Sequence, residues 1–551
     1  YVDEDGNVKN NFAARFRKAY NTAFSAVLKK YQRGVMVFIK HKWLTWATLG
    51  LAMIGLVLLM NNTKTGLVPD EDQGTIMINV TTAPGSSLAE TNKIMGKVGE
   101  RLKSIPQIRD FQQVAGYGMI AGQGNSYGMC IVRLKDWSER PDKADAVNAV
   151  IGQIYARTAD IKDAQIFAVA PPMITGYGTS TGFEMYLQDQ TGGDITDFYN
   201  IYLQYIYALN QRPEIQMAYS TFNINFPQYM VDIDAAKAKR AGISPTEILS
   251  TLSGYYGGQY VSNINRFSKV YRVMIQADPK YRLDPESLNN VYVRMQNGEM
   301  APISQFVKLT KVYGSEVLSR FNMYNSIAIS GTVADGYSTG DAIKAIEEVA
   351  EQVLPKGYGY DFGGLTREES QTGSNTAIIF GICIILIYLI LSALYESFLI
   401  PFAVILAVPC GLLGSFILVK LIGQENNIYL QTGLIMIIGL LSKTAILITE
   451  YAADRRKSGM SLSQAAFSAA KARLRPILMT ALTMIIGLFP LIVASGAGAN
   501  GNRSLGVGAV GGMLVGTLAL LFVVPVLFMV FQVIEERVMP KRRIEDDDEE
   551  R

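Results

Sequence analysis

Apolar residues gather in six long runs along the chain. The first occupies Leu44–Met60, and five more follow after a long polar interval. Each run is long enough to form a helix across the roughly 30 Å hydrocarbon core of a bilayer. The five later runs are Thr376–Leu394, Leu399–Leu421, Ile428–Tyr451, Leu474–Ser495 and Leu505–Val533. The pattern therefore predicts an α-helical membrane domain of six transmembrane helices.

Basic residues beside these runs predict their orientation. Arg33, Lys40 and Lys42 precede the first run, and Lys541–Arg543 follow the last. Basic residues are retained on the cytoplasmic side of a membrane, so both flanks are expected there. A further basic loop falls on the same side and contains Arg455, Arg456, Lys457, Lys471, Arg473 and Arg475. The polar interval 61–375 is then expected on the opposite side of the membrane.

The polar interval alternates strand patterns with helix patterns. Apolar and polar residues alternate over Ile76–Val80, and Ser87 with Glu90 forms a capping box for the following helix. Strand–helix–strand patterns recur through the interval. We therefore expect an α+β domain built of ferredoxin-like βαβ repeats. A third unit, with an extended loop or hairpin at Gly257–Phe267, is expected to be inserted into the second repeat.

The two ends of the chain have their own patterns. Between Asn11 and Arg33, aromatic and aliphatic residues recur at three- and four-residue spacing with basic residues between them. This is typical of an amphipathic helix on a membrane surface, and packing against other protein is the alternative. The acidic stretch Glu545–Glu550 is expected to be a solvated tail. The chain begins at Tyr1 without an initiator methionine or signal peptide, so an upstream part of a longer protein is expected to be missing.

Composition excludes several classes of function. The formal net charge is only +3, so no nucleic-acid partner is expected, and the three cysteines give no disulfide framework. His41 is the only histidine, and the sequence holds no nucleophile–base set, zinc-ligand spacing or phosphate-binding loop. We therefore expect neither an enzyme nor a resident cofactor or metal.

Lys443 is the strongest candidate for a functional residue. It lies inside the apolar run Gly433–Thr449. A charge near the middle of a membrane helix costs roughly 2.5–3.5 kcal/mol, so it should face protein or water and pair with an anion. Snorkelling to the headgroups suits Lys420, near the end of a run, better than Lys443. The apolar runs contain no central aspartate or glutamate, so the counter-charge is expected from another polypeptide.

Five motifs, in this order and at this spacing, make the chain resemble the C-terminal half of a resistance-nodulation-division (RND) transporter. The branch that it resembles is the hydrophobe/amphiphile, or multidrug, exporters of Gram-negative bacteria. The motifs are Val68–Gly74 (VPDEDQG), Arg133–Trp137 (RLKDW), Ser392–Ser397 (SALYES), Gly439–Glu450 and Arg473–Thr480 (RLRPILMT).

The resemblance implies a proton/drug antiporter in the inner membrane. Such a protein exports drugs or other amphiphilic compounds from the periplasm or inner membrane, using the proton-motive force. It works as a homotrimer with a periplasmic adaptor and an outer-membrane channel, and its N-terminal half supplies the carboxylates. An RND-like metal-ion exporter and a non-transport sensor or scaffold are the alternatives. The methionines that a soft metal would need lack paired spacing (Met119, Met129, Met173 and Met185).

The resemblance also assigns roles to single residues. Lys443, Arg473 and Thr480 match the proton relay, although Arg473 could be only a cytoplasmic anchor and Thr480 could bond its own helix. The glycines of the switch loop correspond to Gly116, Gly118, Gly122 and Gly124. The substrate-binding positions correspond to Tyr117, Met119, Ile131, Phe167 and Val169. Well-known multidrug members place phenylalanines in this loop, and a plain sheet core is the alternative for Phe167.

The patterns and the resemblance together divide the chain into domains. We expect an interfacial helix at 1–42, a first transmembrane helix at 43–61, a porter subdomain at 62–175, a second porter subdomain at 176–228 and 319–372, a docking subdomain with a protruding arm at 229–318, five transmembrane helices at 373–538 and a charged disordered tail at 539–551.

Overall fold

The computed structural model describes residues 12–119, 121–178, 181–334, 336–496 and 498–538. The acidic tail and the first eleven residues, for which we made predictions, lie outside the described residues. The chain divides into two compact units. Residues 1–81, 91–221 and 319–551 form the first, and residues 82–90 and 222–318 form the second.

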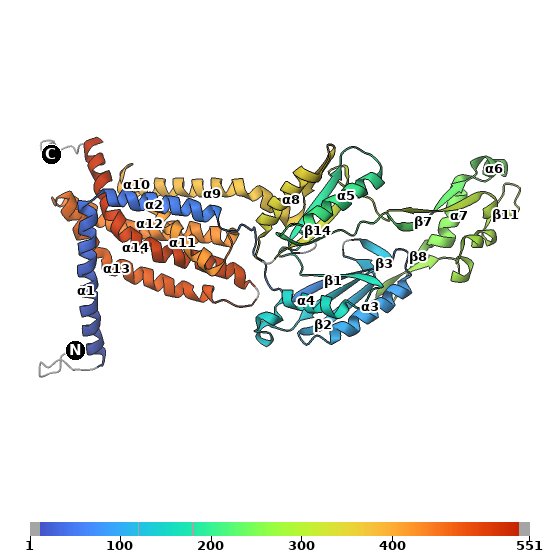
Figure 1. Ribbon diagram of the computed structural model, residues 1–551, viewed down its shortest axis with the longest axis horizontal. Coiled ribbons are helices and arrows are strands. Elements are labelled where there is room, and N and C mark those ends of the chain that lie inside the picture. Colours follow the sequence, from blue (N-terminus) through green and yellow to red (C-terminus); the bar gives the residue numbers. More distant parts are fainter. Residues whose placement is uncertain (1–11, 120, 179–180, 335, 497, 539–551) are drawn as a thin grey trace. The chain divides into compact units, whose positions relative to one another are not determined.

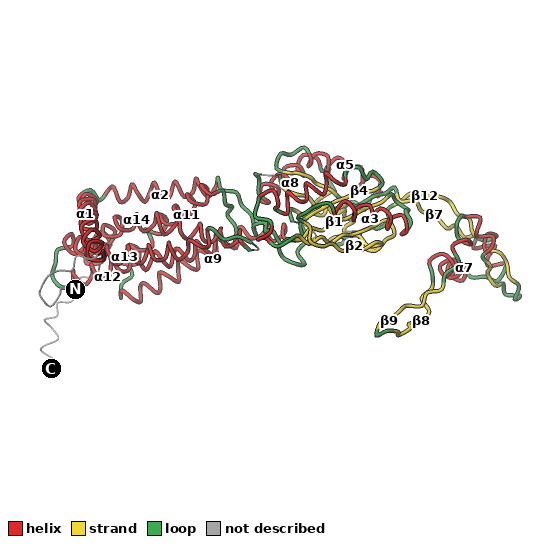
Figure 2. The backbone as a smooth tube through the Cα atoms, turned by 90° about the horizontal axis from the view of Figure 1, so that it is seen from below, coloured by secondary structure: helices red, strands yellow, loops and turns green. Residues whose placement is uncertain are grey.

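Six helical segments of the described residues are long and apolar enough to cross a membrane, as the apolar runs predicted. Figure 2 shows that this part of the chain is helical throughout. The segments are α2 (Trp43–Asn61), α9 (Gly364–Tyr395), α10 (Ile400–Ile405) continued by α11 (Val408–Ile422), α12 (Ile428–Lys457), α13 (Leu462–Ile492) and α14 (Ala499–Val538). Helices α9 and α13 begin at 364 and 462, upstream of the apolar runs predicted from 376 and 474, because polar turns continue each helix beyond its run. Lys471, Arg473 and Arg475, expected in a loop, therefore lie within α13.

Helix α14 forms the centre of the membrane part. In its most apolar segment 61% of the residues are buried, against 6% for α9, so α9 presents its apolar surface outward. Glycines bring α14 close to α11: an added Cβ on Gly511 would lie 2.7 Å from the Gly414 carbonyl oxygen, and one on Gly414 would lie 2.6 Å from the Gly511 carbonyl oxygen. Small residues permit such close approach of membrane helices.

The first sheet of the polar interval has four strands in the order β2-β3-β1-β4. They are β1 (Thr75–Thr82), β2 (Ile108–Gly118), β3 (Gly122–Leu134) and β4 (Ala164–Val169). Helices α3 (Leu88–Lys103) and α4 (Val147–Thr158) share one hydrophobic core with the sheet, in which Ile78, Val98 and Val150 are fully buried. Ser87 Oγ accepts a hydrogen bond from the Glu90 N–H at the start of α3, as the capping pattern predicted.

The second sheet is assembled from distant parts of the sequence (Figure 1). Its strands run in the order β13-β14-β5-β15, and β6 also pairs with β14. The elements are β5 (Phe183–Asp189), α5 (Ile195–Asn210), β6 (Ile215–Tyr219), β13 (Ser319–Phe321), β14 (Tyr324–Val333), α8 (Thr339–Val353) and β15 (Tyr358–Phe362). Strands β6 and β14 pair although residues 222–318 separate them in the sequence.

The second unit has a small core of its own, which includes Ile243, Ile248 and Ile303. Its elements are β7 (Phe226–Ile233), α6 (Ala235–Arg240), α7 (Pro245–Leu252), β8 (Gln259–Arg266), β9 (Lys269–Ile275), β10 (Tyr292–Arg294), β11 (Met300–Pro302) and β12 (Val307–Gly314). Strands β8 and β9 form an antiparallel hairpin over Gln259–Ile275. The stretch Gly257–Phe267, expected to be an extended loop or hairpin, therefore holds only the first strand of a longer hairpin.

Candidate functional site

Lys443 lies on the exposed side of α12. Its neighbours Leu441 and Ala445 are buried in the membrane core, and the lysine itself is exposed. Among the described residues, no salt bridge reaches its ammonium group. The α12 backbone therefore places a cation on the outer face of an apolar bundle, where this part of the chain offers no anion.

Arg473 lies against the C-terminal end of α12. Its guanidinium carbon is 4.9 Å from the centre of the Tyr451 ring, and that of Arg455 is 5.0 Å from the same ring. Arg455 also donates a hydrogen bond to the Tyr451 hydroxyl at 2.6 Å. The Arg473 Nε is buried and has no hydrogen-bond partner among the described residues. Tyr451 follows Lys443 by about 12 Å along the helix, so Arg473 and Lys443 lie at different heights along α12.

Thr480 bonds to its own helix. Its hydroxyl donates to the backbone oxygens of Pro476 at 3.1 Å and Ile477 at 3.0 Å. The structure thus has the alternative named above, in which the Thr480 hydroxyl bonds to the backbone of its own helix. The Thr480 side chain is nevertheless exposed. Helices α12 and α13 pack together. The structure therefore brings the helices of the three relay candidates together, but among the described residues no hydrogen bond joins their side chains.

The glycine-rich loop forms the connection between β2 and β3. Gly118 pairs with Gly122 at the end of the ladder, and the register shifts beside Gly116, which adopts φ +88°. A bulge that needs positive φ favours glycine. Tyr117 is 45% exposed, and the Met119 N–H donates to the buried Asn79 Oδ1 at 3.0 Å. Ile120, in the middle of the loop, lies outside the described residues.

Phe167 and Val169 line a cavity between the two sheets of the polar interval. The cavity measures about 620 Å³, within the range of small-molecule sites, and Met217 and Thr332 line its other side. The Phe167 ring contacts that of Tyr219, with ring centres 3.6 Å apart. Phe167 is thus at a cavity wall and not only in a sheet core. The other three substrate candidates (Tyr117, Met119 and Ile131) do not line this cavity.

A buried ion pair joins one of the sequence motifs to the segment that follows another. Arg140, just after the RLKDW motif, is almost fully buried, and its two terminal nitrogens lie 2.5 and 2.6 Å from the carboxylate oxygens of Asp72 in the VPDEDQG motif. Asp72 also accepts from the N–H groups of Gly74 and Val147. Burial acts to raise the pKa of Asp72, but these bonds and the charge of Arg140 outweigh it, and the pKa is lowered.

We predict that Asp72→Ala destabilises the protein by about 3–5 kcal/mol, because it leaves the Arg140 guanidinium buried without its anion. Thermal unfolding of the purified chain measures this loss. The neighbouring exposed Asp136→Ala is the matched control and should change stability little. Equal unfolding midpoints for the two variants would show that another group compensates the buried charge of Arg140.

Glu71 of the same motif caps the longest helix. Its carboxylate accepts from the N–H groups of Asn500 at 3.1 Å and Gly501 at 2.7 Å, in the first turn of α14. Asn500 Nδ2 donates to the Asp70 backbone oxygen at 2.6 Å. A carboxylate at a helix N-terminus satisfies free N–H groups and the helix dipole. The segment leading into β1 is therefore tied directly to α14.

The structure also assembles carboxylates that sequence reasoning missed. Glu369, in the polar first turns of α9, accepts from the Thr339 hydroxyl at 2.7 Å. The charge of Glu425 acts on Glu369, and the Glu425 Oε2 would be 3.0 Å from a Cβ on Gly66. Burial raises the pKa of Glu369 to about 7, and the charges of Glu425 and Asp70 add to the rise. No local pattern signals this group, because its members come from distant segments.

We predict that Glu369→Gln removes a pH dependence of stability. The folded pKa of about 7 lies above the ordinary 4.5, so the folded protein binds this proton more tightly than the unfolded chain. Ionisation then destabilises the fold progressively between pH 4.5 and 7, by about 1–2 kcal/mol after allowance for partial exposure. Unfolding midpoints measured from pH 5 to 8 should fall more steeply for the wild type than for the variant. The exposed Glu368→Gln is the control, and parallel slopes for Glu369→Gln and wild type would contradict the assignment.

Comparison with known proteins identifies the family. The family model described as AcrB/AcrD/AcrF matches residues 4–532. The chain belongs to the AcrB/AcrD/AcrF family of RND transporters. The toluene efflux pump membrane transporter TtgB of Pseudomonas putida is 36% identical over 513 residues, covering 93% of this chain and 48% of the relative. The multidrug resistance protein MdtF of Escherichia coli is 33% identical over 533 residues, covering 96% of this chain and 51% of the relative.

The family assignment confirms the resemblance seen in the motifs. This chain spans about half the length of the curated relatives that it matches. A third relative, the solvent-resistant pump membrane transporter SrpB of Pseudomonas putida, is 34% identical over 95% of this chain and 50% of its own length.

Proposed function

We propose that this chain is the C-terminal half of a proton-motive-force-driven exporter of drugs, solvents or other amphiphilic compounds. The observation that carries the proposal is the exposed Lys443 within an apolar helix, which has no anionic partner among the described residues. The names of the relatives, which are pumps for toluene, solvents and multiple drugs, support the substrate class. The proposed location is the inner membrane of a Gram-negative bacterium.

The proposed partners follow from this role. The preceding half of the same transporter supplies carboxylates to Lys443, and a homotrimer works with a periplasmic adaptor and an outer-membrane channel. In the proposed relay, Lys443 exchanges a carboxylate partner for another acceptor, with Thr480 a candidate. Arg473, held on the Tyr451 ring at the cytoplasmic end, helps the proton leave.

The proposed architecture assigns the extramembrane parts. The strand order β2-β3-β1-β4, with α3 and α4 on a shared core, supports a ferredoxin-like porter subdomain at 62–175. The sheet built around β5 and β14 supports a second one at 176–228 and 319–372. The separate core of the second unit supports a docking subdomain at 229–318, and the β8–β9 hairpin is its arm. The interfacial helix at 1–42 and the transmembrane segments at 43–61 and 373–538 complete the proposed division.

The proposed substrate path joins the cavity between the sheets to the glycine-rich hairpin. Phe167 and Val169 form part of the cavity wall. Tyr117 and Met119 offer aromatic and flexible apolar contacts at the hairpin end of the same sheet, and Ile131 adds an apolar side chain farther along β3. The switch-loop glycines (Gly116, Gly118, Gly122 and Gly124) let that hairpin change conformation.

We predict that Tyr117→Ala and Met119→Ala each narrow the range of exported compounds while the protein still assembles. The side chain of Tyr117 is largely exposed, so its removal costs little stability and removes a ligand contact. Minimum inhibitory concentrations for a panel of amphiphiles measure the range. Tyr313→Ala, an exposed tyrosine of the second unit, is the matched control. Unchanged resistance to every compound would argue against a binding role.

Transport by the complete protein tests the proposed function. The full transporter, purified and reconstituted in proteoliposomes, should move a fluorescent amphiphile when a pH gradient is imposed and stop when an ionophore dissipates it. Transport of metal ions but no amphiphile would favour the metal exporter. Failure to transport either, with the trimer intact, would favour a sensor or scaffold.

A further inference from the structure

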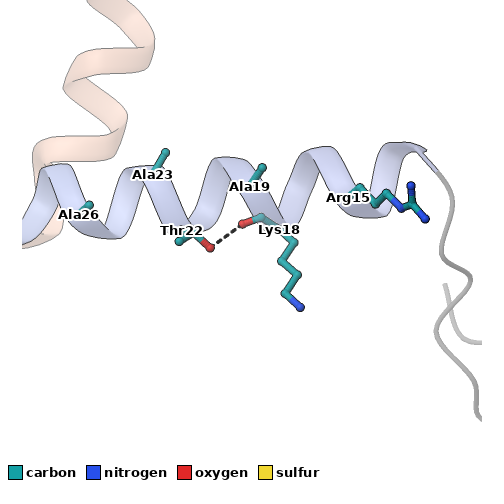
Figure 3. Close-up of a pocket in the computed structure, with 6 residues that line it drawn as sticks. All are labelled: Arg15, Lys18, Ala19, Thr22, Ala23 and Ala26. Atoms are coloured by element: carbon teal, nitrogen blue, oxygen red, sulfur yellow. Dashed lines mark hydrogen bonds between the residues drawn. The ribbon is translucent and has the colours of Figure 1, made fainter.

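A shallow hollow of about 590 Å³ follows the N-terminal half of helix α1 (Phe12–Lys40). Figure 3 shows that its lining belongs to this single helix, and the hydrogen bond drawn there joins the Thr22 hydroxyl to the Lys18 backbone oxygen one turn earlier. Small-molecule sites place a few polar groups around an enclosed apolar pocket. The lining residues of this hollow bring no such groups together, in contrast to the residues at the hairpin end of the first sheet.

Asn79 is buried on the face of the first sheet that the helices do not cover. Ile78 and Val80 point into the core shared with α3 and α4, so Asn79, between them on β1, points to the opposite face. Met77 and Thr81 point the same way and are only half-buried, whereas Asn79 is 3% exposed. A segment outside β1 must therefore cover the asparagine.

The end of the β2–β3 hairpin provides this cover. The Met119 N–H donates to Asn79 Oδ1 at 3.0 Å, and an added Cβ on Gly118 would lie 3.3 Å from the same oxygen. That Cβ would also lie 3.1 Å from the Tyr127 Cβ on β3. In the strand order β2-β3-β1-β4, strand β3 separates β2 from β1. The hairpin end therefore bends over β3 to reach a side chain on β1.

The two strands of the hairpin are held by different contacts. The β2–β3 ladder shifts register between Ala115 and Tyr117, which lets the end of β2 change direction. On the β3 side, the Thr91 hydroxyl of α3 donates to the Asn125 backbone oxygen at 2.7 Å. Helix α3 thus fixes the β3 strand, and Asn79 holds the end of β2.

The side-chain amide of Asn79 suits this contact. Its oxygen accepts from the Met119 N–H, and its nitrogen donates to the Thr81 hydroxyl at 3.3 Å. The second bond fixes which side of the amide faces the hairpin. A leucine of similar size would fill the same space but would leave the Met119 N–H without this acceptor, and a donor buried without an acceptor is unfavourable.

We propose that Asn79 is a positioning residue that fastens the hairpin end to the first sheet and so sets the position of Tyr117 and Met119. These two substrate-contact candidates flank Gly118, which lies against the Asn79 amide. The effect on substrate binding rests on the proposed function, whereas the fastening itself does not depend on it.

Hydrogen exchange of the full chain tests the fastening directly. In Asn79→Leu the Met119 amide should exchange about tenfold faster than in the wild type, the effect expected for one lost hydrogen bond. The Val132 amide, in the part of β3 that pairs with both β1 and β2, should keep its protection and show that the sheet stays folded. Thr81→Val is the matched control, because it removes the other bond of Asn79 and keeps the contact to Met119. Unchanged Met119 exchange in Asn79→Leu overturns the proposal.

A second variant displaces the hairpin end without altering Asn79. Gly118→Ala places a methyl group closer to Tyr127 and to Asn79 Oδ1 than an ordinary contact allows, so it should also speed exchange at Met119. Gly96→Ala on α3 is its control, because an added Cβ there meets no heavy atom of the described residues within 4 Å. Faster exchange at Val132 together with Met119 in both test variants would assign Asn79 to the folding of the sheet and overturn the positioning role.

Efflux by the complete transporter separates positioning from general damage. For compounds whose export depends on Tyr117, Asn79→Leu should raise the half-maximal concentration severalfold and leave the maximal rate near that of the wild type, because the contact is less preorganised. A lower maximal rate at an unchanged half-maximal concentration overturns the positioning role. Absence of efflux from the wild type would count against the proposed function, and the exchange rates would still decide whether Asn79 fastens the hairpin.

Discussion

Lys443→Ala, introduced into the complete transporter, is expected to abolish efflux driven by an imposed pH gradient while insertion and assembly persist. The lysine is exposed on α12, and removing an exposed side chain leaves no cavity in the buried core around Leu441 and Ala445. Folding should therefore survive. Export should fail because the proposed carboxylates of the preceding half lose the cation to which they respond.

The physical reason lies in the pKa of the partner carboxylate. An ammonium nearby favours the ionised carboxylate, and a proton that neutralises the carboxylate releases the lysine towards other acceptors. These two arrangements make a bistable element that protonation biases. Without the ammonium, burial keeps the carboxylate protonated, so the site stops cycling. Lys443→Arg should also fail, since a rigid guanidinium fork does not replace a mobile point charge.

Proteoliposome efflux, with assembly confirmed by size, measures the effect of these variants. Lys420→Ala is the matched control, because Lys420 is an exposed lysine near the end of α11 and is expected to snorkel. It should retain export. Wild-type efflux from assembled Lys443→Ala protein would leave Lys443 a structural residue and remove the main support for the proposed function.

Deletion of the β8–β9 hairpin is expected to prevent the proposed trimer from forming without unfolding the second unit. Every residue of β8 is exposed, and large apolar side chains along the hairpin have no cover within the unit, including Val261 at 53%, Val270 at 66% and Ile275 at 60% exposure. Exposed apolar surface of this extent is typical of a protein interface. A neighbouring protomer is the proposed cover.

The structure indicates how to remove the hairpin cleanly. Gly258 and Gln276 flank it, and an added Cβ on Gly258 would lie 3.7 Å from the Gln276 Cβ, so a short glycine linker closes the gap. Gln276 is held in place by its bond to the Tyr256 backbone oxygen at 2.7 Å. The core residues of the unit, such as Ile248, lie outside the deleted segment. The unit should therefore fold without its arm.

The turn of the hairpin supplies the control. Phe267 and Ser268 have φ values of +54° and +59°, which Asn-Gly adopts more readily. Phe267→Asn with Ser268→Gly keeps the arm and should keep the trimer. Native mass spectrometry or light scattering on the purified transporter reports the oligomer. A normal trimer after deletion would place the assembly contacts elsewhere.

The sequence alone determined the membrane part and its unusual charge. A bilayer demands about twenty apolar residues for each crossing, so the runs from Leu44–Met60 onwards predict spans without any knowledge of their packing. The same requirement makes a charged residue inside an apolar run, such as Lys443, unusual. The cap at Ser87 and the extended strand within Gly257–Phe267 were also foreseeable, because both depend on residues only a few positions apart.

Tertiary structure alone decided which distant residues meet. Asp72 lies in the VPDEDQG motif and Arg140 follows the RLKDW motif, and nothing in either stretch predicts that one carboxylate bridges a buried guanidinium and the start of α4. In the sequence, Glu369 is an ordinary polar residue. Packing places its carboxylate beside the Thr339 hydroxyl and removes it from water. The wall formed by Phe167 likewise exists only where two sheets face each other. Local patterns record interactions over a few residues and with solvent, whereas pKa shifts, ion pairs and cavities depend on the packing of the whole chain.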